Sequence, residues 1–69
     1  MSMNRNPVES SNLKSAGYED TVLEIEFLDG GVYQYFDVPQ AVYDGLIQAE
    51  SPGKYFWANI RGAFRYARV

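Results

Sequence analysis

The tripeptide Asp-Gly-Gly at residues 29–31 separates two runs of alternating apolar and polar side chains, and it constrains the fold more than any other feature of the chain. Before it, residues 22–28 alternate three large apolar side chains with two glutamates, a pattern typical of a strand with one buried face. After it, Tyr33 and Tyr35 occupy alternate positions. Glycine-rich turns of this kind favour a tight connection between antiparallel strands. We therefore predict a β-hairpin at the centre of the fold.

The length of this turn decides which way the two tyrosines face, because a one-residue change of register exchanges the two faces of a strand. A two-residue loop pairs Phe27 with Val32 and directs the tyrosines to the side of the glutamates. A three-residue turn with a glycine bulge pairs Phe27 with Tyr33 and Ile25 with Tyr35, and it directs the tyrosines to the core. We prefer the bulged turn, because its second glycine can adopt a positive φ and because it buries more apolar area.

The flanking segments predict a further strand on each side and two helices between them. Residues 13–18 and 64–69 are the expected strands. Pro39 is expected at the first position of a helix that runs to about Glu50, and Ser51-Pro52 is expected to begin a short second helix that Gly62 closes. The predicted fold is an α+β domain with a small, mainly antiparallel sheet in the order β-β-β-α-(short α)-β and helices packed on one face.

We expect residues 1–7 to form a flexible arm and residues 8–69 to form a single domain, which is all that 69 residues allow. The chain has no cysteine and no histidine, which excludes a disulfide framework, a Cys/His zinc site and histidine-based catalysis. Glu24 and Glu26 share one strand face, and we expect them to be solvated rather than to work as a catalytic pair. The sequence therefore predicts a protein that is not an enzyme and holds neither cofactor nor metal.

The absence of cysteine and of an apolar segment after the N-terminus favours a cytoplasmic protein without a secretory signal. No apolar run approaches the length that crosses a bilayer, so we expect no membrane association.

Charge is distributed unevenly along the chain. The net charge is −3, but residues 1–50 carry −7 and residues 51–69 carry +4. An acidic chain argues against tight non-specific binding to nucleic acid, whereas its basic last quarter leaves room for a local contact. The candidate phosphate-binding residues are Lys54, Arg61, Arg65 and Arg68. The simpler interpretation, which we favour, is that these side chains are solvated and that their stems cover apolar surface.

Three aromatic residues are candidates for stacking on a ligand. Tyr33 and Tyr35 lie at alternate strand positions, and rings arranged in this way can stack on nucleic-acid bases. A small domain also needs such rings in its core, and we favour that structural role for both tyrosines. Trp57, the one tryptophan, is expected to cover the core partly, whereas an exposed Trp57 would indicate a partner surface.

Over residues 7–69 the chain resembles the KTSC domain, a module found at the C-terminus of some lysyl-tRNA synthetases and also alone in small bacterial and phage proteins. The matching positions are Val8, Ser10, Ser11, Gly17, Tyr18, Leu23, Ile25, Phe27, Tyr33, Tyr35, Val38, Pro39, Tyr43, Ala49, Ser51, Gly53, Lys54, Tyr55, Phe56, Ile60, Arg61, Phe64 and Tyr66. Two positions depart from the pattern. Trp57 stands where the family usually has Asn, and Phe64-Arg65-Tyr66 stands where Tyr-Pro-Tyr is common.

The resemblance to a synthetase-associated module implies RNA binding. We therefore expect a non-catalytic binding module whose partner is RNA or a nucleic-acid-associated protein. The alternative is a protein-interaction module, including a homodimer formed through an exposed edge strand or through Trp57.

Overall fold

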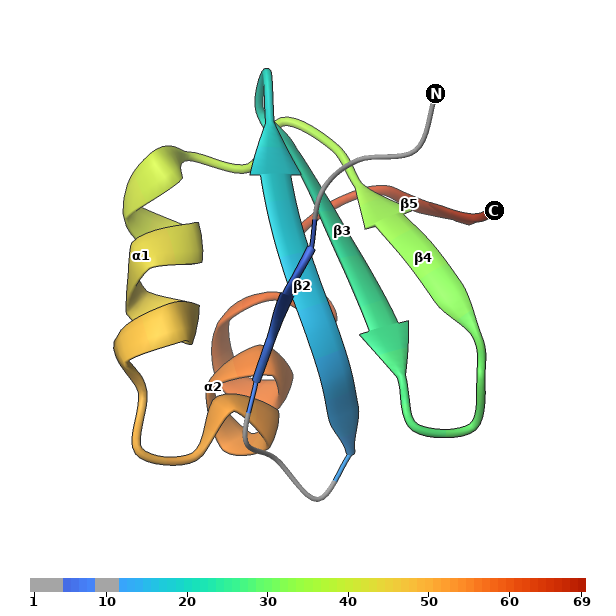
Figure 1. Ribbon diagram of the computed structural model, residues 1–69. Helices are drawn as coiled ribbons and strands as arrows, with labels where there is room; N and C mark the ends of the chain where they lie inside the picture. Colours follow the sequence, from blue (N-terminus) through green and yellow to red (C-terminus); the bar gives the residue numbers. More distant parts are fainter. Residues whose placement is uncertain (1–4, 9–11) are drawn as a thin grey trace.

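The computed structural model describes residues 5–8 and 12–69, which form one antiparallel sheet with two helices packed on one of its faces (Figure 1). The elements, in chain order, are β1 (Asn6–Pro7), β2 (Leu13–Glu19), β3 (Val22–Phe27), β4 (Val32–Tyr35), α1 (Gln40–Gln48), α2 (Pro52–Asn59) and β5 (Tyr66–Arg68). The strands lie side by side in the order β1-β2-β3-β4-β5, and each neighbouring pair is antiparallel. The predicted α+β fold and its element order are confirmed, with β1 as an additional strand.

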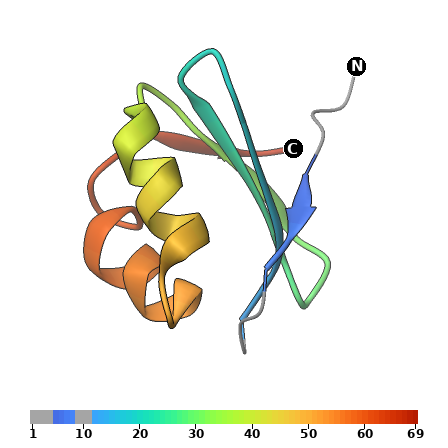
Figure 2. The ribbon, with the colours of Figure 1, turned by 60° about the vertical axis from the view of Figure 1, so that its left-hand side comes forward.

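Both helices lie on one side of the sheet (Figure 2), and β1 is its edge strand, next to β2. Both helices lie in the connection between β4 and β5. After them the chain returns to the sheet, where β5 pairs with β4 as the edge strand. The core fills the space between the helices and the sheet. Its buried side chains are Leu13, Ala16, Leu23, Ile25, Tyr35, Val38, Leu46, Phe56 and Ile60.

The hairpin turn between β3 and β4 is three residues long, but it begins one residue earlier than we predicted. The amide of Gly30 donates to the carbonyl of Phe27 at 2.9 Å, and the amide of Phe27 donates to the carbonyl of Gly31 at 2.8 Å. Residues 28–30 therefore form the loop. Gly30, with a φ of 95°, takes the left-handed position that such a loop requires.

The earlier turn shifts the strand pairing by two residues from the predicted register. Tyr33 pairs with Ile25, and Tyr35 pairs with Leu23, so the expected pairing of Phe27 with Tyr33 was wrong. A shift by an even number of residues leaves the faces of a strand unchanged. Both tyrosines accordingly face the helices, and Tyr35 belongs to the buried core.

The helix boundaries differ from the expected ones at three points. Pro39 is the N-cap of α1, with an extended ψ of 149°, so that the helix begins one residue later than predicted and ends at Gln48. Ser51 and Pro52 occupy the predicted N-cap and first helical positions of α2. However, α2 ends at Asn59, and Gly62 lies outside it, because the chain turns at the C-cap to bury Ile60 completely.

Part of the predicted N-terminal arm forms an edge strand of the sheet. Residues 1–4 of the expected flexible arm lie outside the described residues. Asn6 and Pro7, however, pair with Ala16 and Ser15 of β2, and this part of the arm belongs to the sheet. The last strand is in turn shorter than residues 64–69, since only Tyr66–Arg68 pair with β4.

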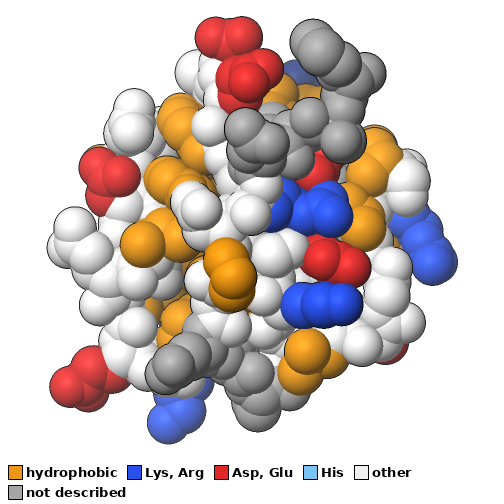
Figure 3. Space-filling model, viewed as in Figure 1, with side chains coloured by type: hydrophobic (Ala, Val, Ile, Leu, Met, Phe, Trp, Pro, Cys, Tyr) orange, Lys and Arg blue, Asp and Glu red, His pale blue; other side chains and the backbone are white. Residues whose placement is uncertain are grey.

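The two glutamates of β3 do not form the solvated face that we expected. Glu24 is only 4% exposed. Its two carboxylate oxygens accept hydrogen bonds from Nη1 of Arg5, at 2.5 Å, and from Nε2 of Gln34, at 3.0 Å. Glu26 lies 3.6 Å from Nη2 of the same arginine. Basic and acidic side chains meet on this face of the molecule (Figure 3). The arrangement arises because the chain around β1 brings Arg5 across the strand.

Gly45 allows the two helices to pack closely. A Cβ atom at this position would lie 2.6 Å from Cζ of Tyr55, closer than real side chains approach. The glycine in the middle of α1 therefore makes room for the tyrosine ring of α2. Neither helix, nor any other in the described part of the chain, is long and apolar enough to cross a bilayer.

Candidate ligand-binding groove

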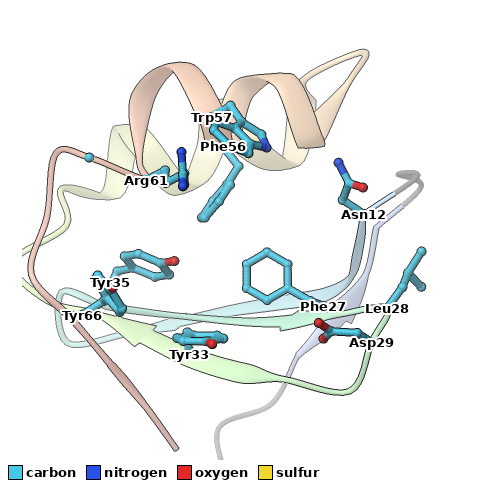
Figure 4. Close-up of a pocket in the computed structure, with 11 residues that line it drawn as sticks. Asn12, Phe27, Leu28, Asp29, Tyr33, Tyr35, Phe56, Trp57, Arg61 and Tyr66 are labelled. Atoms are coloured by element: carbon cyan, nitrogen blue, oxygen red, sulfur yellow. The ribbon is translucent and has the colours of Figure 1, made fainter.

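A groove with a volume of about 920 Å³ opens between α2 and the sheet, and aromatic rings form most of its walls (Figure 4). We call it the aromatic groove. Its lining residues are Asn12, Phe27, Leu28, Asp29, Tyr33, Tyr35, Phe56, Trp57, Arg61, Gly62 and Tyr66. The volume falls within the range of roughly 300–1,000 Å³ that is usual for ligand sites.

The helix side of the groove carries one buried ring and one exposed ring. Phe56 points into the core, where its ring meets those of Phe27 and Tyr35 edge-on, with centroids 5.4 Å and 5.6 Å away. Trp57, the next residue along α2, points outward and is 58% exposed. Arg61 follows one helical turn later, and its guanidinium carbon lies 3.8 Å from the centroid of the indole. This distance is typical of a cation–π contact.

The sheet side of the groove is a continuous layer of rings. Tyr33 and Tyr35 of β4 share one strand face, and Tyr66 of β5 pairs directly with Tyr35. The ring centroid of Tyr66 lies 5.9 Å from that of Tyr33 and 5.5 Å from that of Tyr35. Phe27 of β3 extends the layer, with its ring 5.6 Å from Tyr33. The exposed part of this layer is a surface on which a planar group can stack.

Four of the seven predicted site residues line this groove, namely Tyr33, Tyr35, Trp57 and Arg61. Lys54 lines a smaller neighbouring hollow of about 470 Å³, which shares Trp57 with the groove. Arg68 lies on the other side, with its guanidinium carbon 5.9 Å from the ring centroid of Tyr33. The structure thus brings basic side chains to both flanks of the aromatic groove.

Arg65 does not join the other basic residues at the groove. Its Nη2 donates to Oδ2 of Asp37 at 2.9 Å, and its guanidinium carbon lies 5.9 Å from the ring centroid of Phe36. Arg65 directly precedes β5, and its side chain pairs with Asp37 and does not line the groove. It therefore serves best as a control for the groove arginines.

Sequence reasoning missed several residues of the groove. Tyr66 could have been found, because it alternates with Phe64 in the predicted last strand. No pattern in the sequence places Asn12 beside Asp29, since the two residues are far apart in the chain. A backbone hydrogen bond of 2.9 Å from Leu28 to the carbonyl of Asn12 holds the start of β2 beside the hairpin turn. Only this tertiary contact brings the two polar side chains to the same end of the groove.

Burial raises the pKa of the Tyr35 hydroxyl from 10.0 to about 12, and the nearby phenols of Tyr66 and Tyr33 add to the rise. The folded state therefore favours the neutral phenol. Its contribution to stability is present in full below pH 10.0 and is lost as the pH rises towards about 12. At roughly 1.4 kcal/mol for each unit of pKa the loss would reach about 2–3 kcal/mol, and solvent screening at the groove keeps it below that value.

This pH dependence is measured by urea unfolding of the wild type and of Tyr35→Phe across the same pH interval. Phenylalanine keeps the ring and lacks the titrating hydroxyl, so the variant should lose less stability than the wild type. Equal losses in the two proteins would contradict the role of Tyr35.

The groove combines ring faces with a few polar side chains. Within residues 5–8 and 12–69, no group of three or more His, Cys, Asp and Glu side chains is placed to hold a metal ion. The groove offers ring faces for stacking, an arginine at one end and a carboxylate and an amide at the other. Groups of these kinds can stack on a planar ring and form hydrogen bonds to its polar edge.

A five-stranded antiparallel sheet backed by two helices defines a class of small α+β modules, and comparison with known proteins places the chain within it. The sequence model of the KTSC domain matches residues 9–64. The chain belongs to the KTSC domain family, and the predicted resemblance is confirmed.

Relatives of this chain occur both alone and within larger proteins. The crystal structure of a KTSC domain protein from Yersinia pestis is 38% identical and superposes with a TM-score of 0.93 over 99% of each chain. An uncharacterized protein of Stutzerimonas stutzeri is 43% identical over 70 residues, which are 97% of this chain and 99% of the relative. A lysine–tRNA ligase of Trichormus variabilis is 43% identical over 63 residues, which are 88% of this chain but only 11% of the ligase.

Proposed function

We propose that the protein is a non-catalytic binding module that takes single-stranded RNA in the aromatic groove. The observation that carries this proposal is the exposed pair of Trp57 and Arg61, which stands across the groove from the tyrosine layer (Figure 4). A base stacks on rings of this kind with about 1–3 kcal/mol, whatever its sequence. A large exposed tryptophan beside other rings is also a common mark of an interaction surface.

The charges around the groove fit a polyanion. Arg61, just after the C-cap of α2, lines the groove, and Lys54, in the first turn of α2, lines the adjoining hollow. Phosphates on either side of a stacked base can contact these two side chains. Because the whole chain carries −3, the attraction is local, and it favours a short stretch of RNA over general binding to any nucleic acid.

The relatives support an RNA ligand. The name lysine–tRNA ligase says that those relatives act on tRNA, and this chain matches one segment of them. A cytoplasmic location, which the sequence without cysteine favours, would give the protein access to such RNA.

The test is a fluorescence anisotropy titration with a labelled single-stranded oligoribonucleotide and with tRNA at low salt. Two phosphate contacts predict that log K falls with log salt concentration with a slope of about −1.4, from about −0.7 for each contact to a single strand. An absence of binding at high micromolar protein, or binding that salt does not weaken, would overturn the proposal.

Two arginine variants then locate the site. We expect Arg61→Ala to weaken binding and to reduce the salt slope by about 0.7, because it removes one phosphate contact. Arg65→Ala should leave both unchanged, since Arg65 lies outside the groove and pairs with Asp37.

Trp57→Ala should weaken RNA binding by about 5- to 150-fold, the equivalent of about 1–3 kcal/mol for one stacked base. The free energy of unfolding should change by less than about 1 kcal/mol, because the side chain is largely exposed and contributes little to the core. Unfolding in urea, followed by circular dichroism, separates the two effects. A variant that loses stability and affinity together would point to a structural role for Trp57.

The second candidate function is self-association through the edge of the sheet. All three residues of β5 are exposed, and a free edge strand can pair with another chain. Sedimentation across a range of concentrations tests it, and a strict monomer would exclude it.

A further inference from the structure

We infer that the aromatic groove prefers guanine to the other bases and that the carboxylate of Asp29 makes the selection. This inference rests on the proposed binding of RNA and goes beyond it, since stacking alone accepts every base. The starting observation is that Asp29 lines one end of the groove, whereas Arg61 lies at the other end (Figure 4).

Three chemically different groups meet around Gly31. A Cβ atom built on this glycine would lie 3.2 Å from Oδ1 of Asp29, 3.3 Å from Cε1 of Tyr33 and 4.0 Å from Nη2 of Arg68. A hydrogen-bond acceptor, an aromatic ring and a hydrogen-bond donor are therefore adjacent. Gly31 is buried, and its lack of a side chain allows these groups to lie so close together.

The hairpin turn holds the carboxylate in place. Oδ1 of Asp29 accepts the amide of Gly31 at 2.9 Å, which fixes the orientation of the side chain. Each carboxylate oxygen can accept more than one hydrogen bond. Within the described residues, Oδ2 has no hydrogen bond or ion pair with another side chain. Asp29 is exposed and can thus receive donors from a ligand.

Guanine is the standard base whose edge fits this arrangement. Its N1–H and N2–H groups are adjacent donors that match the two oxygens of a carboxylate, and its O6 accepts a hydrogen bond from an arginine. Adenine and cytosine each place an acceptor beside their amino group, and uracil places a carbonyl on each side of its single N–H. These acceptors would face the negative charge of Asp29. A base stacked against Tyr33 is therefore read by Asp29 on one side and by Arg68 on the other.

The test uses four labelled oligoribonucleotides of equal length that are uridine-rich and differ only in the central base. We expect the one with guanine to bind the wild type about tenfold more tightly than the others, the discrimination of a good bidentate contact. Asp29→Asn should remove this preference. Asparagine keeps an oxygen that can accept the amide of Gly31, so the hairpin should remain intact, as circular dichroism can verify.

Asp44→Asn is the matched control. It makes the same change of charge on the exposed face of α1, outside the groove, and it should leave the preference for guanine unchanged. Equal binding of all four oligonucleotides by the wild type would overturn the inference and leave RNA binding intact. Binding of none of them would overturn both. A preference for guanine that persists in Asp29→Asn would show that another group reads the base.

Discussion

Replacing Arg5 with methionine is expected to cost the protein about 2–3 kcal/mol of folding free energy. Methionine keeps the apolar part of the arginine side chain, but it leaves the buried carboxylate of Glu24 without a positively charged partner. Breaking a fully buried ion pair costs about 3–5 kcal/mol. The side chain of Glu24 is 5% exposed, but that of Arg5 is 25% exposed, and solvent screening at this end reduces the expected loss. Urea denaturation followed by circular dichroism measures it.

The chain provides a matched control in Arg65→Met. This arginine pairs with Asp37 at 2.9 Å, and the two side chains are 79% and 77% exposed. Exposed pairs of this kind contribute only about 0–1 kcal/mol, so we expect little change. The double variant Arg5→Met/Glu24→Gln should recover part of the loss, because it no longer leaves a charge unpaired. If Arg5→Met and Arg65→Met lost similar amounts of folding free energy, burial of Glu24 would not be the cause of the loss.

Leu46→Ala is expected to have the other large effect, a loss of about 2–5 kcal/mol. Leu46 is the buried residue of α1, and its side chain is completely enclosed between the helix and the sheet. A domain of this size has a total stability of roughly 3–10 kcal/mol, at about 0.05–0.15 kcal/mol per residue. The variant should therefore be close to unfolding at room temperature, which thermal and urea denaturation would reveal.

Ile47→Ala tests whether this effect depends on position. It removes a side chain of the same size from the next residue of the same helix, where the isoleucine is 41% exposed. We expect a loss of no more than about 1 kcal/mol, because little apolar contact disappears. If Ile47→Ala destabilised the protein as much as Leu46→Ala, α1 would bury a different face from the one described.

The stability and the binding predictions concern opposite sides of the sheet. Glu24, which binds Arg5, alternates along β3 with Leu23 and Ile25 of the core and so lies on the outer face. The aromatic groove opens on the face that carries the helices. Arg5→Met should therefore lower stability and still bind RNA below its unfolding transition. Trp57→Ala should keep its stability and lose affinity for RNA. This contrast distinguishes a loss of the binding surface from a general loss of the fold.

The elements themselves could be predicted because each depends on local physical chemistry. Alternation at Leu23, Ile25 and Phe27 specifies a strand with one buried face, and Ser51 followed by proline specifies the start of a helix. The orientation of the two tyrosines was predicted from the preference for a three-residue turn. The exact turn did not, because two adjacent glycines can each supply the positive φ and the pairing can shift by two residues without exposing the core.

The sequence by itself determined the antiparallel hairpin, the two helices and the aromatic core, since period and turn chemistry act over a few residues. Only the tertiary structure decided the rest. It placed Arg5 against Glu24, brought Asn12 and Asp29 to one end of the groove, and set Trp57 and Arg61 across from Tyr66. It also separated Arg65 from the other basic residues. The first two of these placements, and the pairing of Arg65 with Asp37, join residues distant in the chain. Such contacts depend on how the sheet and helices pack rather than on local propensity.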